Sequence, residues 1–160
     1  PAENLIGQEG EGFCEIMKNF QRERLVVSII SVSASQKALE DTIAYARERV
    51  VFDRPLSKIQ IIRHRIADMT TQIEAARQLT YYVSWLFSQG RATDKEISMT
   101  KLFTTEVANR IAYDALQIHG GYGYMREFPV ERFYRDARVL TIGAGTSEIM
   151  REIISKRLEL

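Results

Sequence analysis

The sequence has a single cysteine, Cys14, among its 160 residues, so it cannot form an internal disulfide. A lone cysteine suits a reducing compartment, such as the cytoplasm or the mitochondrial matrix, and we expect Cys14 to be a small buried residue. No run of about 18 apolar residues is present, and no basic leader precedes a short apolar core. We therefore expect neither a membrane span nor a signal peptide.

The sequence also has no excess charge of either sign. Lys and Arg total 22 and Asp and Glu total 21, so a net charge of +1 provides no field that would collect nucleic acid. The two histidines, His64 and His119, have no cluster of metal-ligating residues around them, and no metal site is expected. Because the chain starts with Pro1 and not Met, we expect further residues to precede it in the whole protein.

Glycine and proline are scarce inside three long segments with helical periodicity. Residues 1–12 contain three glycines and read as an inter-domain segment, whereas residues 13–160 read as one domain. Apolar residues then recur at intervals of three or four. In the first segment this spacing predicts one apolar face, which we expect to be buried, formed by Phe13, Ile16, Met17, Phe20, Leu25, Ile29, Val32 and Leu39. The helices expected are 13–47, 59–89, 99–118, 129–139 and 147–158.

This pattern predicts an all-α fold. No segment alternates with period two for long, so no strands are expected, and the β-branched residues of 26–32 fall inside a helical pattern. Three long amphipathic helices with short connections pack best as an antiparallel up-down four-helix-type bundle, with an extra short C-terminal helix.

Two glycine-containing stretches are not explained by core packing. Residues 117–124 place glycines directly after a helix, where a ligand or another surface can approach the backbone. Residues 141–151 place two glycines before a Thr/Ser helix start, which offers free N–H groups to an electron-rich group. Each stretch alone is equally compatible with an ordinary helix cap.

Taken in order, several separated stretches resemble the C-terminal domain of the acyl-CoA dehydrogenases over essentially the whole chain. The stretches are Pro1–Gly7, Glu23–Leu25, Arg49–Phe52, Gln117–Gly123, Arg135–Arg138 and Gly145–Ile149. The resemblance implies a helical bundle preceded by another helical domain and a small β domain. It also implies that FAD lies between domains and across a subunit interface.

The resemblance assigns cofactor contacts by motif position. Arg49 and Phe52 would reach the FAD of a neighbouring subunit, although each also reads as an ordinary helix-end residue. The stretch after the third long helix would grip the adenosine diphosphate end, and the last helix start would add two further contacts. Val51 and Asp53 depart from the family, which commonly has threonine and glycine there. The remaining contacts implied are Gln117, Gly120, Gly121, Thr146 and Glu148.

The family reaction needs a carboxylate over the α-carbon of an acyl-CoA thioester. Most members place this glutamate directly before the Gly-Thr of the last motif, where this chain has Ala144. A minority, resembling the isovaleryl-CoA and long-chain enzymes, carries the base in a Glu-Arg-Leu context on the first long helix. We therefore expect Glu23 to be the base, Arg24 to orient it or to weaken it, and Gly143 and Ala144 to contact substrate. Without the resemblance, Glu23 would read as a solvated surface charge.

The implied protein is an FAD-dependent acyl-CoA dehydrogenase that passes electrons to an electron-transfer flavoprotein. Two alternatives stay open: an acyl-CoA oxidase or flavin monooxygenase of the same superfold, and a helical assembly module without catalysis. Apolar helix faces indicate a homo-dimer or tetramer. The Glu-Arg-Leu placement slightly favours branched or longer acyl chains. Because half of the flavin envelope would come from other domains, we expect these 160 residues alone to bind FAD weakly or not at all.

Overall fold

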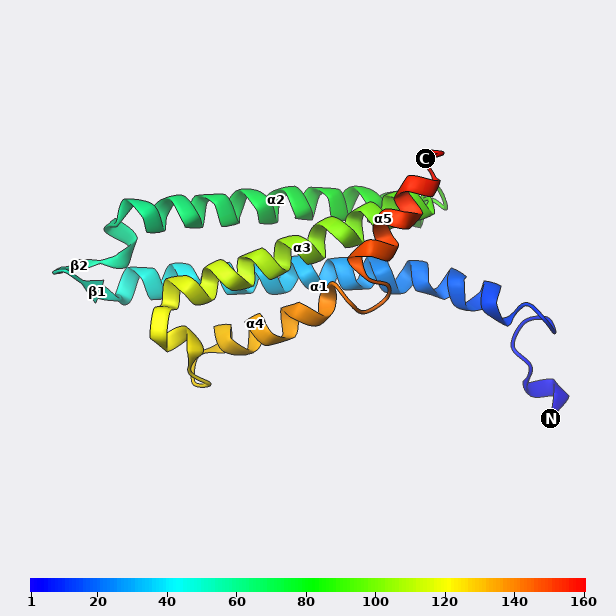
Figure 1. The fold of residues 1–160 in the computed structure, drawn as a ribbon, viewed down its shortest axis with the longest axis horizontal. Helices are drawn as coiled ribbons and strands as arrows, with labels where there is room; N and C mark the ends of the chain where they lie inside the picture. Colours follow the sequence, from blue (N-terminus) through cyan, green and yellow to red (C-terminus); the bar gives the residue numbers. More distant parts are fainter.

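The computed structural model describes residues 1–160 and contains five α-helices (Figure 1). A 3-10 turn, Ala2–Asn4, precedes them, and two more, Leu56–Lys58 and Gly120–Tyr124, connect them. The helices are α1 (Gly12–Glu48), α2 (Gln60–Ser88), α3 (Asp94–His119), α4 (Pro129–Leu140) and α5 (Ser147–Lys156). All five helices expected from the periodicity are therefore present.

Helix α2 runs antiparallel to both α1 and α3, which therefore run in the same direction, and the shorter α4 packs beside α1 and α3 (Figure 1). Helix α5 lies against the first half of α3, at the end of the bundle where α2 connects to α3 (Figure 1). This arrangement confirms the all-α, up-down four-helix-type bundle with an extra short C-terminal helix.

The expectation of no strands is wrong at one place, the connection between α1 and α2. Strand β1 (Val50–Val51) pairs antiparallel with β2 (Arg54–Pro55). The two residues between them, Phe52 and Asp53, have φ angles of 49° and 58°. Two successive left-handed residues form the tight turn that matches the twist of a hairpin, so even two-residue strands can pair here. A left-handed conformation at residue 53 is one that glycine adopts without strain, which fits the glycine implied at this position by the resemblance.

The main core lies where α1, α2 and α3 meet, and Val130 of α4 closes one side of it. Alanines on all three long helices allow the backbones to approach closely, and branched side chains fill the remaining space. The fully buried apolar side chains include Met69, Ile73, Val107 and Ile111, each at most 2% exposed. Burying such a side chain stabilises the fold by about 1.5–3 kcal/mol.

The buried face of α1 is more polar than its apolar spacing predicts. Ser28, Ser31, Ser35 and Thr42 are buried, and each donates its hydroxyl hydrogen to the carbonyl four residues earlier in the same helix. Because these hydroxyls are satisfied within their own helix, they can pack as small groups against α3. They replace part of the apolar face expected for this helix.

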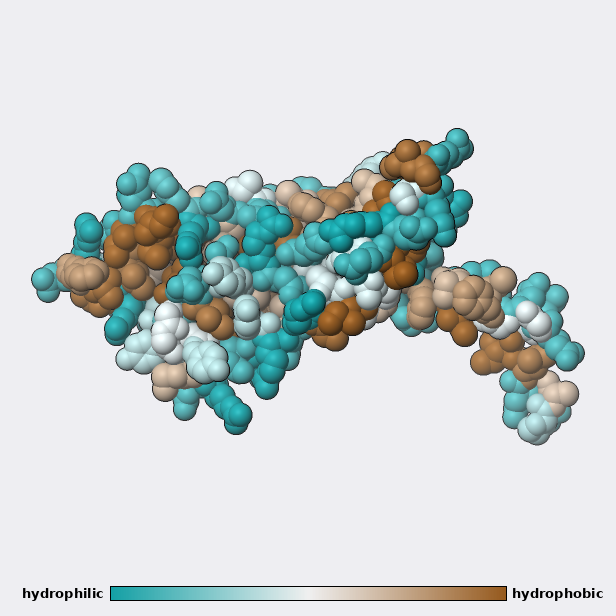
Figure 2. Space-filling view, in the orientation of Figure 1, coloured by the Kyte–Doolittle hydropathy of each residue, from teal (hydrophilic) through white to brown (hydrophobic).

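Correspondingly, several apolar residues of α1 are not in the core. Phe13, Ile16 and Ile29 are 73%, 53% and 45% exposed, respectively, so their expected burial is wrong for this chain. Cys14 is also exposed, contrary to expectation, because the first turns of α1 project beyond the bundle together with residues 1–11. Figure 2 shows apolar surface on this projecting arm. No helix of the structure has both the length and the apolar character needed to cross a bilayer.

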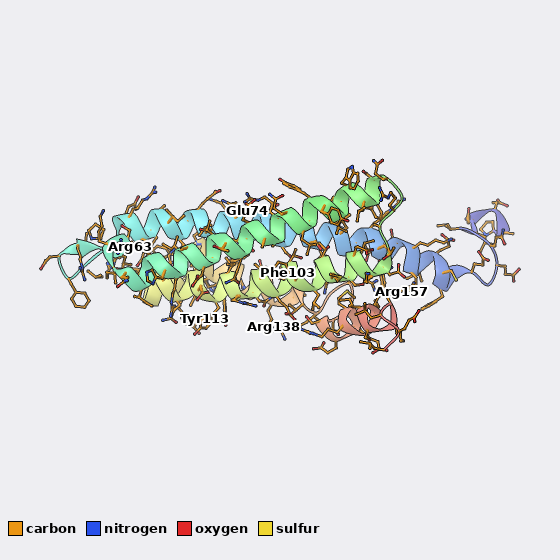
Figure 3. All side chains as sticks on the ribbon, turned by 90° about the horizontal axis from the view of Figure 1, so that it is seen from above. Arg63, Glu74, Phe103, Tyr113, Arg138 and Arg157 are labelled. Carbon is orange, nitrogen blue, oxygen red and sulfur yellow. The ribbon has the colours of Figure 1, made fainter.

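The start of α3 is fixed by a capping box. The Thr93 hydroxyl accepts a hydrogen bond from the N–H of Lys95, and the Glu96 carboxylate accepts one from the N–H of Thr93 at 3.0 Å. Arg157, at the end of α5, donates to Asp94 in the first turn of α3 at 2.7 Å, which ties the chain end to the bundle (Figure 3). These contacts place α5, and with it the turn before α5, against α3.

The capping box generates a pH-dependent prediction. The hydrogen bond from the Thr93 hydroxyl holds the pKa of Glu96 below its ordinary value. A carboxyl with a depressed pKa stabilises the fold above its unfolded pKa, and this contribution is lost as the pH falls through the folded pKa. Glu96→Gln is therefore expected to lower the free energy of unfolding by about 0.5–1 kcal/mol above about pH 5, and by less in more acidic buffer.

Urea unfolding followed by helical circular dichroism at several pH values measures this difference. The matched control is Glu3→Gln, because Glu3 is exposed outside the bundle and accepts no side-chain hydrogen bond. An equal loss of stability at all pH values in Glu96→Gln would contradict the role assigned to the carboxylate.

Candidate functional site

The connection between α4 and α5, residues 141–146, is a tight turn with unusual backbone angles. Ala144 and Gly145 have φ angles of 55° and 101°. At its end, the Thr146 hydroxyl caps α5 by accepting from the N–H of Ile149 at 3.3 Å. A left-handed alanine is strained relative to glycine, so contacts from the surrounding structure have to hold it in place.

Two buried cations supply those contacts. The guanidinium of Arg24, on α1, donates from Nε to the carbonyl oxygen of Ala144 at 3.1 Å. The ammonium of Lys101, on α3, donates to the carbonyl oxygen of Gly145 at 2.6 Å. Arg24 is 4% exposed and Lys101 is fully buried. Two helices far apart in sequence therefore fix two successive carbonyls of the turn.

Burial also shifts the protonation of these cations. It lowers the pKa of Lys101 from its ordinary value, and the neighbouring Arg24 lowers it further, while Glu148 acts in the opposite direction. Burial lowers the pKa of Arg24 too, and Asp94 partly offsets this. The carbonyl dipoles of the turn are the groups that compensate for the lost hydration of both cations.

On the outer side of this turn, Glu23 and Ala144 line the same cavity. Its volume is about 460 Å³, and it lies between α1 and the end of α4. The structure thus brings together the two residues on which the base assignment depends, and it places Gly143 beside them. The cavity wall is mostly apolar, with a charged rim. Its lining consists of Arg22, Glu23, Val26, Val27, Val139, Leu140, Gly143 and Ala144.

Arg24 does not orient the carboxylate of Glu23, which is a correction to the role expected for it. Its side chain points inward to the Ala144 carbonyl and to Gln21, whereas Glu23 is exposed in this chain. The Glu23 carboxylate instead accepts a hydrogen bond from the amide of Asn19, one helical turn earlier, at 2.7 Å. Adjacent residues of a helix point about 100° apart, which explains why one is buried and the other faces the cavity.

Thr146 and Glu148 lie together in a second, polar cleft next to the turn. This cleft has a volume of about 630 Å³ and also contains Arg110, Arg138 and Arg151. The pKa of the Glu148 carboxyl is held below its ordinary value, mainly by a hydrogen bond from its own backbone N–H at the helix start. The Thr146 hydroxyl contributes a second, smaller effect in the same direction. The cleft is therefore lined by charged groups and a helix N-terminus, which suits a polar ligand.

A third hollow lies at the opposite end of the bundle, where the hairpin meets the end of α3. Its volume is about 420 Å³, and it is lined by Arg49, Gly120 and Gly121 together with Tyr122 and His119. The Arg49 guanidinium lies over the Tyr122 ring, 5.2 Å from its centroid. Neither Gly120 nor Gly121 has any atom within 4 Å of the place a Cβ would occupy, so the backbone here is open to an approaching group.

Two residues expected in this group lie outside the hollow. Phe52, at the hairpin tip, is 88% exposed, and Gln117 is exposed on the last turn of α3. Both side chains face solvent in this chain. Of the two histidines, His64 is exposed, whereas His119 is buried and stacks on Tyr45 with ring centroids 4.2 Å apart. His119 is thus a structural residue.

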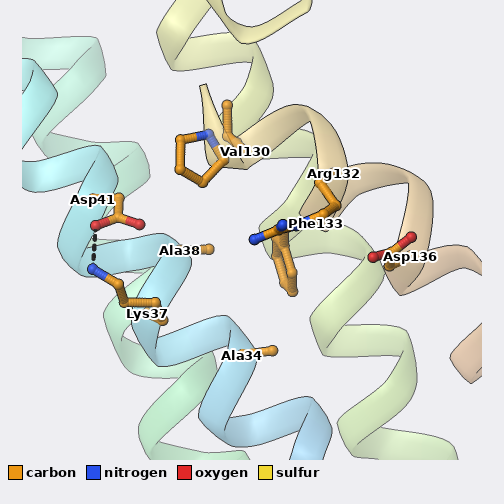
Figure 4. A pocket seen from close by; sticks show the side chains of 9 residues that line it. Ala34, Lys37, Ala38, Asp41, Val130, Arg132, Phe133 and Asp136 are labelled. Carbon is orange, nitrogen blue, oxygen red and sulfur yellow. Dashed lines mark hydrogen bonds and ion pairs between the residues drawn. The ribbon is translucent and has the colours of Figure 1, made fainter. Parts of the chain in front are cut away.

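Another cavity, unlike the three above, contains none of the expected site residues. It lies in the groove between α1 and α4, has a volume of about 260 Å³, and is lined by Ala34, Ala38, Val130 and Phe133 with charged residues at its rim (Figure 4). Lys37 and Asp41 of that rim pair with each other at 2.6 Å. This groove continues along the same two helices that form the Glu23 cavity.

The turn generates a prediction about stability. Gly145→Ala places a Cβ 2.8 Å from the Met150 methyl carbon and requires a non-glycine residue at a φ of +101°. We expect it to lower the free energy of unfolding by about 1–2 kcal/mol. Gly12→Ala is the control, because Gly12 has an ordinary φ and open space around it. Thermal unfolding of both variants measures the difference, and equal stabilities would contradict the strained turn.

Comparisons with known proteins agree with this geometry. The model of the acyl-CoA dehydrogenase C-terminal domain matches residues 10–159. An acyl-CoA dehydrogenase of Bacillus subtilis is 46% identical over 99% of this chain and 42% of its own length. A subunit of a caffeyl-CoA reductase-Etf complex of Acetobacterium woodii is 43% identical over the same shares.

The structural comparison gives the same result. The crystal structure of an acyl-CoA dehydrogenase from Geobacillus kaustophilus superimposes with a TM-score of 0.97 and 41% identity, covering 100% of this chain and 42% of that one. The chain therefore spans less than half the length of the relatives it matches. This chain belongs to the acyl-CoA dehydrogenase family and corresponds to its C-terminal domain.

Proposed function

We propose that the whole protein is an FAD-dependent acyl-CoA dehydrogenase, in which Glu23 removes the α-proton of an acyl-CoA thioester. The observation that carries this proposal is the shared cavity of Glu23 and Ala144. The alanine leaves room where most relatives in the family have a carboxylate, and Glu23 supplies one from the facing helix. FAD, when bound, would accept the hydride that leaves the β-carbon.

The lining of the cavity fits the substrate class. Val26, Val27, Val139 and Leu140 offer an apolar wall for an acyl chain, while Glu23 stands at its edge. A base has to lie within hydrogen-bond reach of the carbon-bound proton that it removes, so a chain held along this wall brings its α-carbon to the carboxylate. In this chain Glu23 is exposed, and we infer that the domains outside it cover the cavity and exclude water.

The residues assigned to FAD fit a cofactor held between two subunits. Arg49 follows Glu23 by 26 residues of an almost continuous helix, which corresponds to about 39 Å at 1.5 Å per residue. This separation is too large for one dinucleotide to contact Arg49 and the Glu23 cavity of the same chain. We infer that Arg49, Phe52, Gln117, Gly120 and Gly121 serve the FAD of a neighbouring subunit, and that Thr146 and Glu148 serve the FAD of their own.

This division requires at least a homo-dimer, and exposed aromatic side chains support self-association. Tyr81, Tyr82 and Trp85 on α2 are each more than half exposed, and Met99 and Phe103 on α3 are about 40% exposed. Single exposed apolar residues are ordinary, but a group of large ones on two adjacent helices is typical of an interface. We propose a dimer or tetramer on this basis.

For electron transfer we propose an electron-transfer flavoprotein as the partner. The Acetobacterium woodii relative is named as a subunit of a caffeyl-CoA reductase-Etf complex, which supports this choice over direct reoxidation by oxygen. The same name raises a second candidate, reduction of an enoyl-CoA, in which a protonated Glu23 would return the proton to the α-carbon. Slow reoxidation of the reduced protein in air would favour the dehydrogenase or the reductase over an oxidase or monooxygenase.

The base assignment is tested in the full-length holoenzyme by Glu23→Gln. A general base contributes about 10²–10⁴-fold to the rate, so kcat on a panel of acyl-CoA thioesters with an artificial electron acceptor is expected to fall at least about 100-fold, with FAD still bound. Glu40→Gln is the matched control, because Glu40 is an exposed carboxylate on the same helix. Undiminished turnover of Glu23→Gln would exclude Glu23 as the base. If neither the wild type nor the variants turn over any thioester of the panel, a non-catalytic module is favoured.

A second prediction concerns the 160-residue chain by itself. Because other domains supply the rest of the flavin envelope, we expect it to bind FAD weakly or not at all, in contrast to the full-length protein. Flavin absorbance of the protein peak after gel filtration with excess FAD measures this binding. A stoichiometric yellow complex of the isolated chain would show that the envelope is complete without the other domains.

A further inference from the structure

Lys101 is a buried charge for which the chemistry described so far has no use. It is the largest fully buried side chain of the molecule, and it forms no ion pair. A buried ammonium without an anionic partner is costly, and a methionine would fill a similar volume without that cost. What the ammonium adds is its hydrogen bond to the carbonyl oxygen of Gly145.

This hydrogen bond sets the direction of an entire peptide group. A trans peptide is planar, so its N–H points opposite to its carbonyl. The carbonyls of Ala144 and Gly145 point inward to Arg24 and Lys101. The N–H groups of the same two peptides, those of Gly145 and Thr146, therefore point away from the interior.

Both of these N–H groups are free. No hydrogen bond within the chain uses either of them, and the residues that carry or adjoin them line the Glu23 cavity and the Thr146 cleft. Adjacent backbone donors on left-handed residues, next to a helix N-terminus, suit an electron-rich oxygen of a bound ligand. The inward carbonyls and the outward donors are two consequences of the same backbone orientation.

We propose that Lys101 is a positioning residue of the active site, which acts through Gly145 and together with Arg24. By holding the Gly145 carbonyl, it fixes the outward N–H of Thr146 and keeps Ala144 in its left-handed conformation beside Glu23. It touches neither substrate nor cofactor. This inference rests on the proposed function, because it assigns Lys101 to the geometry of that same site.

The test uses the full-length holoenzyme with Lys101→Met, which keeps the volume and removes the donor. We expect kcat per bound FAD to fall at least about tenfold, because a misplacement of about 1 Å at a reacting site can slow a reaction about 100-fold. The control is Thr105→Val. Thr105 is fully buried one turn further along α3, and its hydroxyl donates to the Lys101 carbonyl inside the helix, so this variant removes a buried hydrogen bond without affecting the turn.

A second measurement does not depend on activity. Crystal structures of both variants are expected to show the Gly145 carbonyl rotated away from residue 101 in Lys101→Met and unchanged in Thr105→Val. If Lys101→Met fails to fold, Lys101→Gln carries the same comparison, because its amide keeps a shorter donor. Lys101→Gln is expected to have a kcat per bound FAD below that of the wild type and of Thr105→Val, and a kcat equal to theirs would refute the positioning role.

The outcomes separate this inference from the function on which it rests. If Glu23→Gln is inactive but Lys101→Met has a normal kcat per bound FAD, the role of Lys101 is refuted and the proposed function stands. A loss of FAD and of thermal stability with a normal kcat per bound FAD also refutes it, because a merely structural residue behaves in that way. If the wild type turns over no acyl-CoA, the proposed function is refuted, and an unrotated Gly145 carbonyl in Lys101→Met refutes the positioning role independently.

Discussion

The length of α1 is the constraint on which the arrangement of the candidate sites depends. This single helix of 37 residues carries Glu23 near its first third and ends directly before Arg49. A helix is stiff, so the distance between the two places is set by residue count and not by a flexible connection. Any ligand that needs both kinds of contact has to obtain them from two copies of the chain. Self-association is thus a geometric requirement of the proposed cofactor site.

The second feature that shapes the molecule is an interior that contains many polar groups but few unsatisfied ones. Hydroxyls on α1 and α3 bond to their own helices, and the two buried cations bond to carbonyls of the α4–α5 turn. A hydroxyl satisfied in this way behaves as a small packing group, but a cation does not, because its hydration has to be replaced. Arg24 and Lys101 therefore determine the backbone around them far more strongly than the serines and threonines do.

The sequence predicted the helices and their order, because long segments with a period near 3.6 leave little ambiguity. It predicted the buried face of α1 only in part: Leu25, Val32 and Leu39 are buried as their spacing predicts. Ser28, Ser31 and Ser35 lie on the same buried face, where they interrupt the apolar pattern. The hairpin at residues 50–55 was also not predicted, because its two left-handed residues are Phe52 and Asp53, and neither is a glycine that would have marked a tight turn. In both places the local pattern was overridden by packing or by backbone geometry.

The candidate site was predictable to the extent that it depends on motifs. Glu23 and Ala144 are 121 positions apart, so in the sequence only the resemblance to a known family connected them. In the structure both residues line one cavity. Lys101 carries no such signal, because a single lysine in a helical segment ordinarily reads as a solvated charge, and its partner is a carbonyl of the distant α4–α5 turn. Arg24 was correctly predicted as a residue near the site, but its predicted role was wrong, because the helix directs its side chain inward to the Ala144 carbonyl and away from Glu23. Residues that act on a ligand are therefore easier to read from a sequence than residues that act on the backbone, whose partner is a carbonyl that every residue possesses.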